Sequence, residues 1–189
     1  MELRPARLPG VFELVPVVHA DERGFFHETF RRESLRGGPL GEVEFVQENH
    51  SRSSAGVLRG MHFQIGRGIG KLVRCARGSI YDVVVDLRRG SPTYAEWEGF
   101  ELDDLSLRQL WVPVGFAHGF LTLSDLADVI YRQTGYYEPS LERALAWNDP
   151  EIAIDWPLAQ APIVSAKDAA APVLAALAAE LPFEFDAGA

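Results

Sequence analysis

The side chains best suited to proton transfer in this chain are its five histidines. The unperturbed pKa of imidazole, about 6.5, lies close to neutral pH. One of the five, His62, stands in GVLRGMHFQ (residues 56–64), a run of glycine, aromatic and aliphatic residues that is typical of a strand. A histidine in a strand can be a packed core residue or a general base. The residues that could act together with His62 distinguish between these two roles.

Acid–base chemistry at a carbon atom needs a base, an opposed acid, and a cation where negative charge develops. Lys71 begins KLVRCARG nine residues after His62, and its ammonium group could stabilise an enolate oxygen. Tyr131 in VIYRQTGYY could donate a proton from the opposite side. Its alternative role is burial against the core, on the strand face that it shares with Val129 and Gln133. A carboxylate behind His62 could fix the tautomer of its ring.

A second histidine, His118, raises the question of a metal site. The spacing of Pro113, Gly115 and His118 in VPVGFAHGF resembles the second metal motif of cupins, which are jelly-roll β-barrels. Cupin metal sites also use a His-x-His pair and a glutamate from an earlier strand. RGMHFQ supplies one histidine and no glutamate follows nearby, whereas a tight transition-metal site needs at least three ligands. The pattern predicts a barrel of this type without a metal.

The elements that would position these residues are short strands. Segments rich in Val, Ile, Phe, Tyr and Thr alternate with turn sequences such as DERG, DDLS and SDLAD, which is typical of a sandwich or closed barrel. Strands are predicted over 11–19, 24–30, 43–51, 56–64, 71–78, 79–88, 94–102, 108–114, 118–124 and 127–137. Helical patterns occur at 31–38 and at 166–181. The fold class is therefore all-β, with short C-terminal helices.

Alternation in SIYDVVVDL places Asp82 and Asp86 on one strand face together with Ile80 and Val84. Two carboxylates on one face could line a polar cavity. The favoured interpretation is that both acids lie near turns or face solvent.

Composition limits the class of protein. A chain of 189 residues suits one domain, 1–189. The formal net charge of −9 argues against nucleic acid as a partner, but a few focused cations could still bind an anionic small molecule. No apolar run approaches the roughly 18 residues of a membrane span, and the first residues lack a secretory signal. A single cysteine, Cys75, favours a cytoplasmic protein.

Six motifs in order resemble one known family, the dTDP-4-dehydrorhamnose 3,5-epimerases. They are RSSAGVLRGMHFQ, KLVRCARGSIYDVVVDLRRGSPTY, VPVGFAHGFLTLSD, VIYRQTGYYEPSLE, WNDPEIAIDWP and SAKD. The resemblance implies a cupin-type jelly-roll barrel, a homodimer, and no metal or other cofactor. It also implies inversion at C3 and C5 of a dTDP-linked 4-keto-6-deoxy sugar through an enolate.

The resemblance carries over residue by residue. It implies that His62 is the base, that Asp168 in SAKD pairs with it, that Tyr131 is the acid, and that Lys71 stabilises the enolate. The substrate contacts that it implies are Arg23, Phe25, Glu28, Gln47, Asn49, Arg59, His118, Tyr137, Glu142 and Lys167. Arg59 suits a diphosphate because its planar guanidinium donates paired hydrogen bonds.

The alternatives are an epimerase that inverts one carbon, a non-catalytic sugar-binding barrel, and a metal-dependent oxygenase of the cupin type. One departure from the family is the glycine-rich loop FQIGRGIG (63–70), where a proline-rich loop with glutamine is common. One geometric problem also arises in the strand itself. Arg59 and His62 are three residues apart, so both can face one ligand only if a bulge interrupts the strand.

Overall fold

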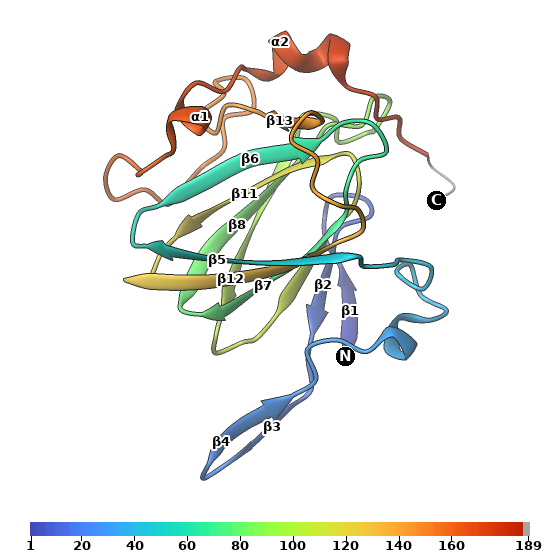
Figure 1. The fold of residues 1–189 in the computed structure, drawn as a ribbon, viewed down its shortest axis with the longest axis vertical. Coiled ribbons are helices and arrows are strands. Elements are labelled where there is room, and N and C mark those ends of the chain that lie inside the picture. Colours follow the sequence, from blue (N-terminus) through green and yellow to red (C-terminus); the bar gives the residue numbers. More distant parts are fainter. Residues whose placement is uncertain (187–189) are drawn as a thin grey trace.

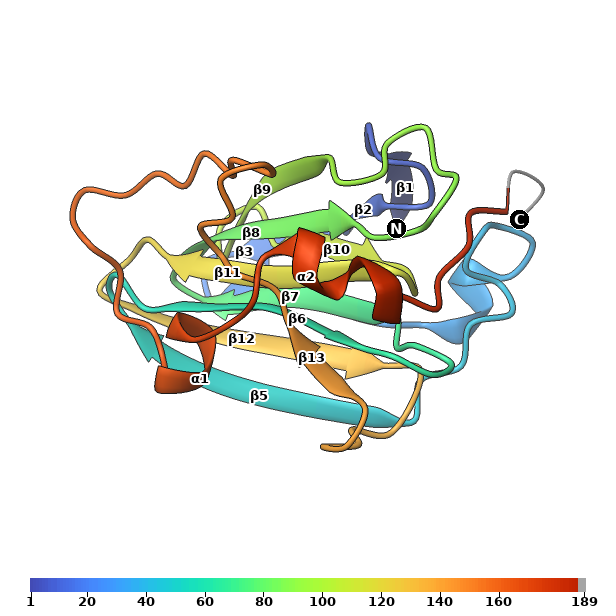
Figure 2. The same cartoon turned by 90° about the horizontal axis from the view of Figure 1, so that it is seen from above.

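Two antiparallel sheets face each other in the computed structural model, which describes residues 1–186 (Figures 1 and 2). The larger sheet has the strand order β1-β2-β10-β7-β12-β5, the smaller has β13-β6-β11-β8-β9, and β3 and β4 form a separate hairpin. The strands are β1 (Glu2–Pro5), β2 (Phe12–Val15), β3 (Val18–Asp21), β4 (Gly24–His27), β5 (Gln47–Ser54), β6 (Leu58–Gln64), β7 (Lys71–Arg77), β8 (Ser79–Asp86), β9 (Trp97–Asp103), β10 (Gln109–Val112), β11 (Phe116–Thr122), β12 (Leu126–Gln133) and β13 (Glu142–Ala144).

The predicted fold class is confirmed, because each of the ten predicted segments contains a strand. The run 11–19 is divided between β2 and β3 around Pro16, since proline has no N–H to donate to a sheet. β5 begins four residues later than predicted and continues through Arg52, Ser53 and Ser54. These polar residues gave no apolar signal for a strand. β1 and β13 were missed because their sequences, ELRP and ERA, are rich in charged residues and give no apolar strand pattern.

The helical segments are shorter than predicted. The pattern at 166–181 forms α1 (Ala166–Ala169), α2 (Leu174–Leu177) and the 3-10 turn η2 (Ala178–Glu180). Pro172 separates α1 from α2 because proline disrupts a helix interior. The pattern at 31–38 forms only the 3-10 turn η1 (Arg32–Leu35). Ser165 accepts a hydrogen bond from the backbone N–H of Asp168 and so caps α1.

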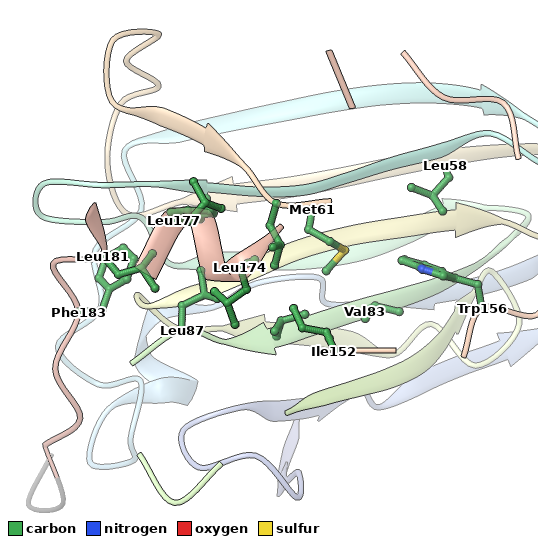
Figure 3. Packing of buried hydrophobic residues seen from close by; sticks show 14 of the residues in the cluster. Leu58, Met61, Val83, Leu87, Ile152, Trp156, Leu174, Leu177, Leu181 and Phe183 are labelled. Carbon is green, nitrogen blue, oxygen red and sulfur yellow. The ribbon is translucent and has the colours of Figure 1, made fainter. Parts of the chain in front are cut away.

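Apolar side chains fill three regions. The space between the sheets holds residues of β7, β10 and β12 packed against residues of β8, β9 and β11, including Val73, Leu110, Val129, Val84 and Phe120. The outer face of the smaller sheet is covered by the C-terminal segment, where Leu174 and Leu177 of α2 contact Met61 and Leu87 (Figure 3). Since both faces of β8 and β11 are buried, the ring nitrogens and carboxylates on these strands are largely removed from water.

The third apolar cluster lies on the outer face of the larger sheet, where Leu35 and Leu40 contact Leu14, Leu72 and Trp111. Beyond this cluster the β3–β4 hairpin projects from the body of the molecule (Figure 1). Within the described residues, no helix is long and apolar enough to cross a membrane.

Candidate active site

A cavity of about 490 Å³ lies between the two sheets, near α1. It is lined by polar residues of both sheets and by the segment before α1: Ser51, Arg59, His62, Lys71, His118, Tyr131, Ser165, Lys167 and Asp168. Val57, Leu58, Phe120, Ile163 and Val164 add an apolar wall. A smaller cavity of about 90 Å³ adjoins it and shares His62, Lys71 and Tyr131. The four predicted catalytic residues therefore lie around one space.

His62 and Asp168 form a close pair, although they are 106 residues apart in the chain. His62 Nε2 lies 2.6 Å from Oδ1 of Asp168, whose side chain is 4% exposed. Burial lowers the pKa of His62 below its ordinary value, and the hydrogen bond to Asp168 offsets this only in part. The imidazole is therefore mainly neutral at pH 7. With the Nε2–H donated to the carboxylate, Nδ1 keeps the lone pair that a base requires.

A β-bulge in β6 resolves the conflict between Arg59 and His62. In the pairing of β6 with β11, His62 lies opposite His118 and Arg59 lies opposite Phe120, so three steps on β6 match two steps on β11. The extra residue turns both side chains toward the large cavity. Gly60 permits the bulge: its φ is +130°, and a Cβ there would lie 2.5 Å from Cα of Gly119.

His118 forms the second histidine–carboxylate pair of the site. Its Nε2 lies 2.9 Å from both Oδ1 and Oδ2 of Asp82, which has no exposed surface. The favoured interpretation of Asp82 and Asp86 as turn-proximal or solvent-facing acids is wrong for Asp82, which is buried in the middle of β8. Asp86 is also buried and does not face solvent, but it ends β8 and lies next to the turn that follows. Asp86 accepts hydrogen bonds from Arg88, Ser91 and Thr93.

Lys71 brings a cationic group from β7 of the larger sheet to the cavity that the two histidines line. The residue keeps some exposed surface, but protein surrounds its ammonium group, and this desolvation lowers the pKa of Lys71 to about 8. Asp82 and Glu142 partly oppose the shift. Its Nζ lies 3.4 Å from the carbonyl oxygen of His62, a long hydrogen bond that leaves donors free for a ligand.

Tyr131 faces the cavity from β12, in the opposite sheet to His62. Burial raises the pKa of Tyr131, while the hydrogen bond with Asn49 and the charge of Arg59 act in the other direction. The phenol is therefore protonated at neutral pH and can donate. Tyr131 also packs against the apolar cluster between the sheets, as its alternative role expects, and it lines both cavities as well.

Several predicted substrate contacts surround the same space. Arg59, His118 and Lys167 line the large cavity, and Tyr137 and Glu142 line the small one. Lys167 and the hydroxyl of Tyr137 both donate to Oε2 of Glu142. Burial alone would raise the pKa of Glu142, but these two donors outweigh it and the pKa lies below its ordinary value.

Gln47 and Asn49 line neither cavity. The side chain of Gln47 donates to Asn49, Asn49 donates to Gln133, and Gln47 accepts from the backbone N–H of Tyr137. They therefore hold residues that line the small cavity. Whether they also contact a ligand stays a prediction.

Arg23, Phe25 and Glu28 lie apart from the other predicted residues. Arg23 and Phe25 are exposed on the β3–β4 hairpin, and Glu28 follows it and pairs with Arg31. None of the three lines either cavity of this chain. Their assignment as substrate contacts also stays a prediction.

Asp82 and Ser51 are among the cavity-related residues that were not predicted as part of the site. Asp82 lies behind His118, and its strand parity with Ile80 and Val84 was the available signal. Ser51 lines the large cavity with a buried Oγ that has no hydrogen-bond partner among the described residues. No sequence signal distinguishes Ser51 from its serine neighbours Ser53 and Ser54.

Among residues 1–186, no group of three or more His, Cys, Asp or Glu side chains is placed to hold a metal ion. His118 and His62 each have an aspartate as hydrogen-bond partner, and their Nε2 atoms are engaged with these carboxylates. The arrangement suits proton transfer next to a cationic group.

Comparison with known proteins shows which family this chain resembles. The family model described as dTDP-4-dehydrorhamnose 3,5-epimerase matches residues 5–176. The chain is 52% identical over 168 residues to the dTDP-4-dehydrorhamnose 3,5-epimerase of Salmonella typhimurium, covering 88% of this chain and 92% of the relative.

Solved structures agree with that match. The dTDP-6-deoxy-D-glucose-3,5-epimerase of Legionella pneumophila, in complex with dTDP-4-keto-L-rhamnose, superposes with a TM-score of 0.93 at 42% identity and covers 98% of this chain and 99% of that one. A 3'-monoepimerase of Streptomyces bikiniensis, in complex with dTDP-quinovose, has a TM-score of 0.86 at 36% identity and covers 92% and 88%. The chain therefore belongs to the dTDP-4-dehydrorhamnose 3,5-epimerase family of isomerases.

Proposed function

We propose that this protein inverts C3 and C5 of dTDP-4-dehydro-6-deoxy-D-glucose and forms dTDP-4-dehydro-L-rhamnose without a cofactor. The observation that carries the proposal is the placement of His62 and Tyr131 on opposite sheets around one cavity, with Lys71 beside them. Inversion requires removal of a proton from one face of a carbon and return of a proton to the other face. A base and an acid on opposite walls meet that requirement.

The steps follow from the protonation states. C3 and C5 both neighbour the C4 ketone, so neutral His62 removes the proton of either carbon and the electron pair moves to O4, giving an enolate. The ammonium group of Lys71 stabilises that oxygen in a site from which water is largely excluded. Tyr131 then protonates the carbon from the opposite face as the ketone re-forms. Proton exchange with solvent returns a proton to Tyr131 and removes one from His62.

The nucleotide would be held by the cations at the cavity. Arg59 and Lys167 can donate to a diphosphate, and His118 lies on the same wall as His62. Tyr137 offers an aromatic face near the smaller cavity. The observed structures of relatives with dTDP-sugars support this class of ligand.

A test of the activity uses the purified protein, dTDP-4-dehydro-6-deoxy-D-glucose and D₂O. The product should carry deuterium at both C3 and C5 in the NMR spectrum. Deuterium at one carbon only would instead identify a single-centre epimerase, the alternative favoured by the similarity to the 3'-monoepimerase. Absence of any exchange would support a sugar-binding protein.

A homodimer would explain the position of the hairpin. Phe25 and Phe26 are large apolar residues that are exposed on it. The hairpin projects from the body of the molecule (Figure 1), and Arg23 and Glu28 line neither cavity of their own chain. We propose that the hairpin delivers Arg23, Phe25 and Glu28 to the site of a second copy.

Subunit mixing tests this arrangement. Arg23→Ala and His62→Asn variants, each poorly active, should regain about one quarter of wild-type activity when dissociated and reassociated together, because random pairing gives half mixed dimers with one intact site each. No gain on mixing, with mixed dimers shown to form, would place the hairpin's function within its own chain.

A cytoplasmic location, which the single Cys75 favours, stays a prediction.

A further inference from the structure

Asp82 is a buried carboxylate that the proposed reaction does not use. It has no exposed surface, so it cannot touch a substrate in the cavity. In the strand pairing it lies opposite Phe120, and His118 lies opposite Val84, so Asp82 and His118 are diagonal neighbours on the inner face. A carboxylate in such a place is costly unless it is paired and hydrogen-bonded.

The hydrogen bonds of Asp82 go to one group. Within residues 1–186, its side-chain oxygens contact only Nε2 of His118, each at 2.9 Å. An ionised carboxylate can only accept, so the Nε2–H must donate and Nδ1 is left for the cavity. No hydrogen bond to Nδ1 is found in the described part of the chain. The pair thus fixes both the ring orientation and the tautomer of His118.

Asp82 also interacts with the cation of the site. Lys71 faces the same cavity as His118, and the charge of Asp82 favours the protonated form of its amine against desolvation. The ionisable groups around Lys71 come from several elements: Asp82 on β8, Glu142 on β13, His62 on β6, His118 on β11 and Tyr131 on β12. Of the two carboxylates, Glu142 is already hydrogen-bonded to Lys167 and Tyr137.

We propose that Asp82 is a positioning residue of this site: its carboxylate orients His118 and serves as the counter-charge of the Lys71 ammonium group. Lys71 can then donate to the oxygen at which negative charge develops, while Nδ1 of His118 presents its lone pair to the cavity and can accept a hydrogen bond from the ligand. The proposal rests on the proposed epimerase function, which it deepens by naming the residue that keeps the oxygen-binding side of the site charged and oriented.

The test compares the pH dependence of kcat/KM in wild type, Asp82→Asn and Glu101→Gln. Glu101 is exposed on β9, so its substitution removes one carboxylate far from the cavity. In wild type the alkaline limb should fall near pH 8, the pKa of Lys71, because the pKa of Tyr131 lies above its ordinary value. Asp82→Asn should move this limb about one pH unit lower, as loss of an opposite charge predicts. Glu101→Gln should leave it in place.

Asp82→Asn should also lower kcat about 10-fold at pH 7 with little change in KM. This loss of kcat is smaller than the 10²- to 10³-fold cost of deleting an oxyanion donor outright. An unchanged alkaline limb in folded Asp82→Asn would overturn the counter-charge role. If the wild-type protein itself shows no epimerisation, the proposed function is wrong, and this result is distinct from a failure of the role proposed for Asp82.

A measurement on the wild-type protein covers the case in which Asp82→Asn does not fold. Nitrogen-15 NMR of the imidazoles at pH 7 should show that Nε2 of His118 carries a proton, with slower solvent exchange than the ring N–H of His62. A His118 protonated on Nδ1 alone would overturn the orienting role. This readout does not depend on activity.

Discussion

Two histidine–aspartate pairs lie side by side in the wall of one cavity, and they differ in their access to water. In the first, the side chain of His62 is 30% exposed and one oxygen of Asp168 lies 2.6 Å from Nε2. In the second, His118 is 8% exposed, and both oxygens of Asp82 lie 2.9 Å from its Nε2. The rings come from directly paired residues of β6 and β11.

The difference separates two tasks that the same residue types can perform. A base must exchange its proton with solvent between turnovers, which the partly open His62 permits. A group that holds a ligand in one orientation gains from a dry, rigid setting, which strands buried on both faces give to His118. The Asp168 partner comes from the short helix α1 at the edge of the cavity, whereas Asp82 comes from β8, an interior strand of the smaller sheet.

The largest effect is expected from substitution of Asp168, the carboxylate of the more exposed His62–Asp168 pair. Asp168→Asn keeps the size of the side chain but removes the charge that holds the His62 tautomer, so kcat should fall by about 10³-fold, within the range attributed to general base catalysis. Steady-state kinetics with an unchanged far-ultraviolet circular dichroism spectrum would establish this. If Asp82→Asn lowers kcat by more than Asp168→Asn does, the assignment of tasks to the two pairs is reversed.

Substitution of Tyr131, the proposed acid on the opposite sheet, should have the next largest effect. Tyr131→Phe removes only the phenolic proton donor, so kcat should fall by about 10²-fold while KM changes little. The measurement is kcat and KM under substrate saturation, with Tyr136→Phe as the matched control on an exposed tyrosine. Equal kcat values for wild type and Tyr131→Phe would remove Tyr131 as the acid.

The register that brings the two pairs together depends on Gly60. Gly60→Ala should lower the free energy of unfolding by about 2 kcal/mol, because a positive φ is strained for alanine and the Cβ would clash with Gly119. Gly56→Ala is the control: its φ is +73°, but open space surrounds the added atom. Urea denaturation compares them, and a smaller loss in Gly60→Ala than in Gly56→Ala would contradict the close-approach argument.

Much of this arrangement could be predicted from the sequence. Alternating apolar residues located the central strands, and the six motifs named the residues of the proposed catalytic set. The bulge at Gly60 could be stated only as a requirement, since register depends on the partner strand. The burial of Asp82 and Asp86 was missed because alternation shows only which residues share a face. The C-terminal segment covers the apolar face of β8, which carries Val83 and Val85, so the face with the two acids turns toward the other sheet. The place of the β3–β4 hairpin depends on tertiary contacts that local patterns do not encode.

The most direct test of the central claim compares the two histidines in D₂O. His62→Asn and His118→Gln are incubated with dTDP-4-dehydro-6-deoxy-D-glucose, and deuterium at C3 and C5 is followed by NMR. His62→Asn should incorporate no deuterium at either carbon, and His118→Gln should label both carbons more slowly than wild type. Exchange at the wild-type rate in His62→Asn, together with none in His118→Gln, would contradict the account.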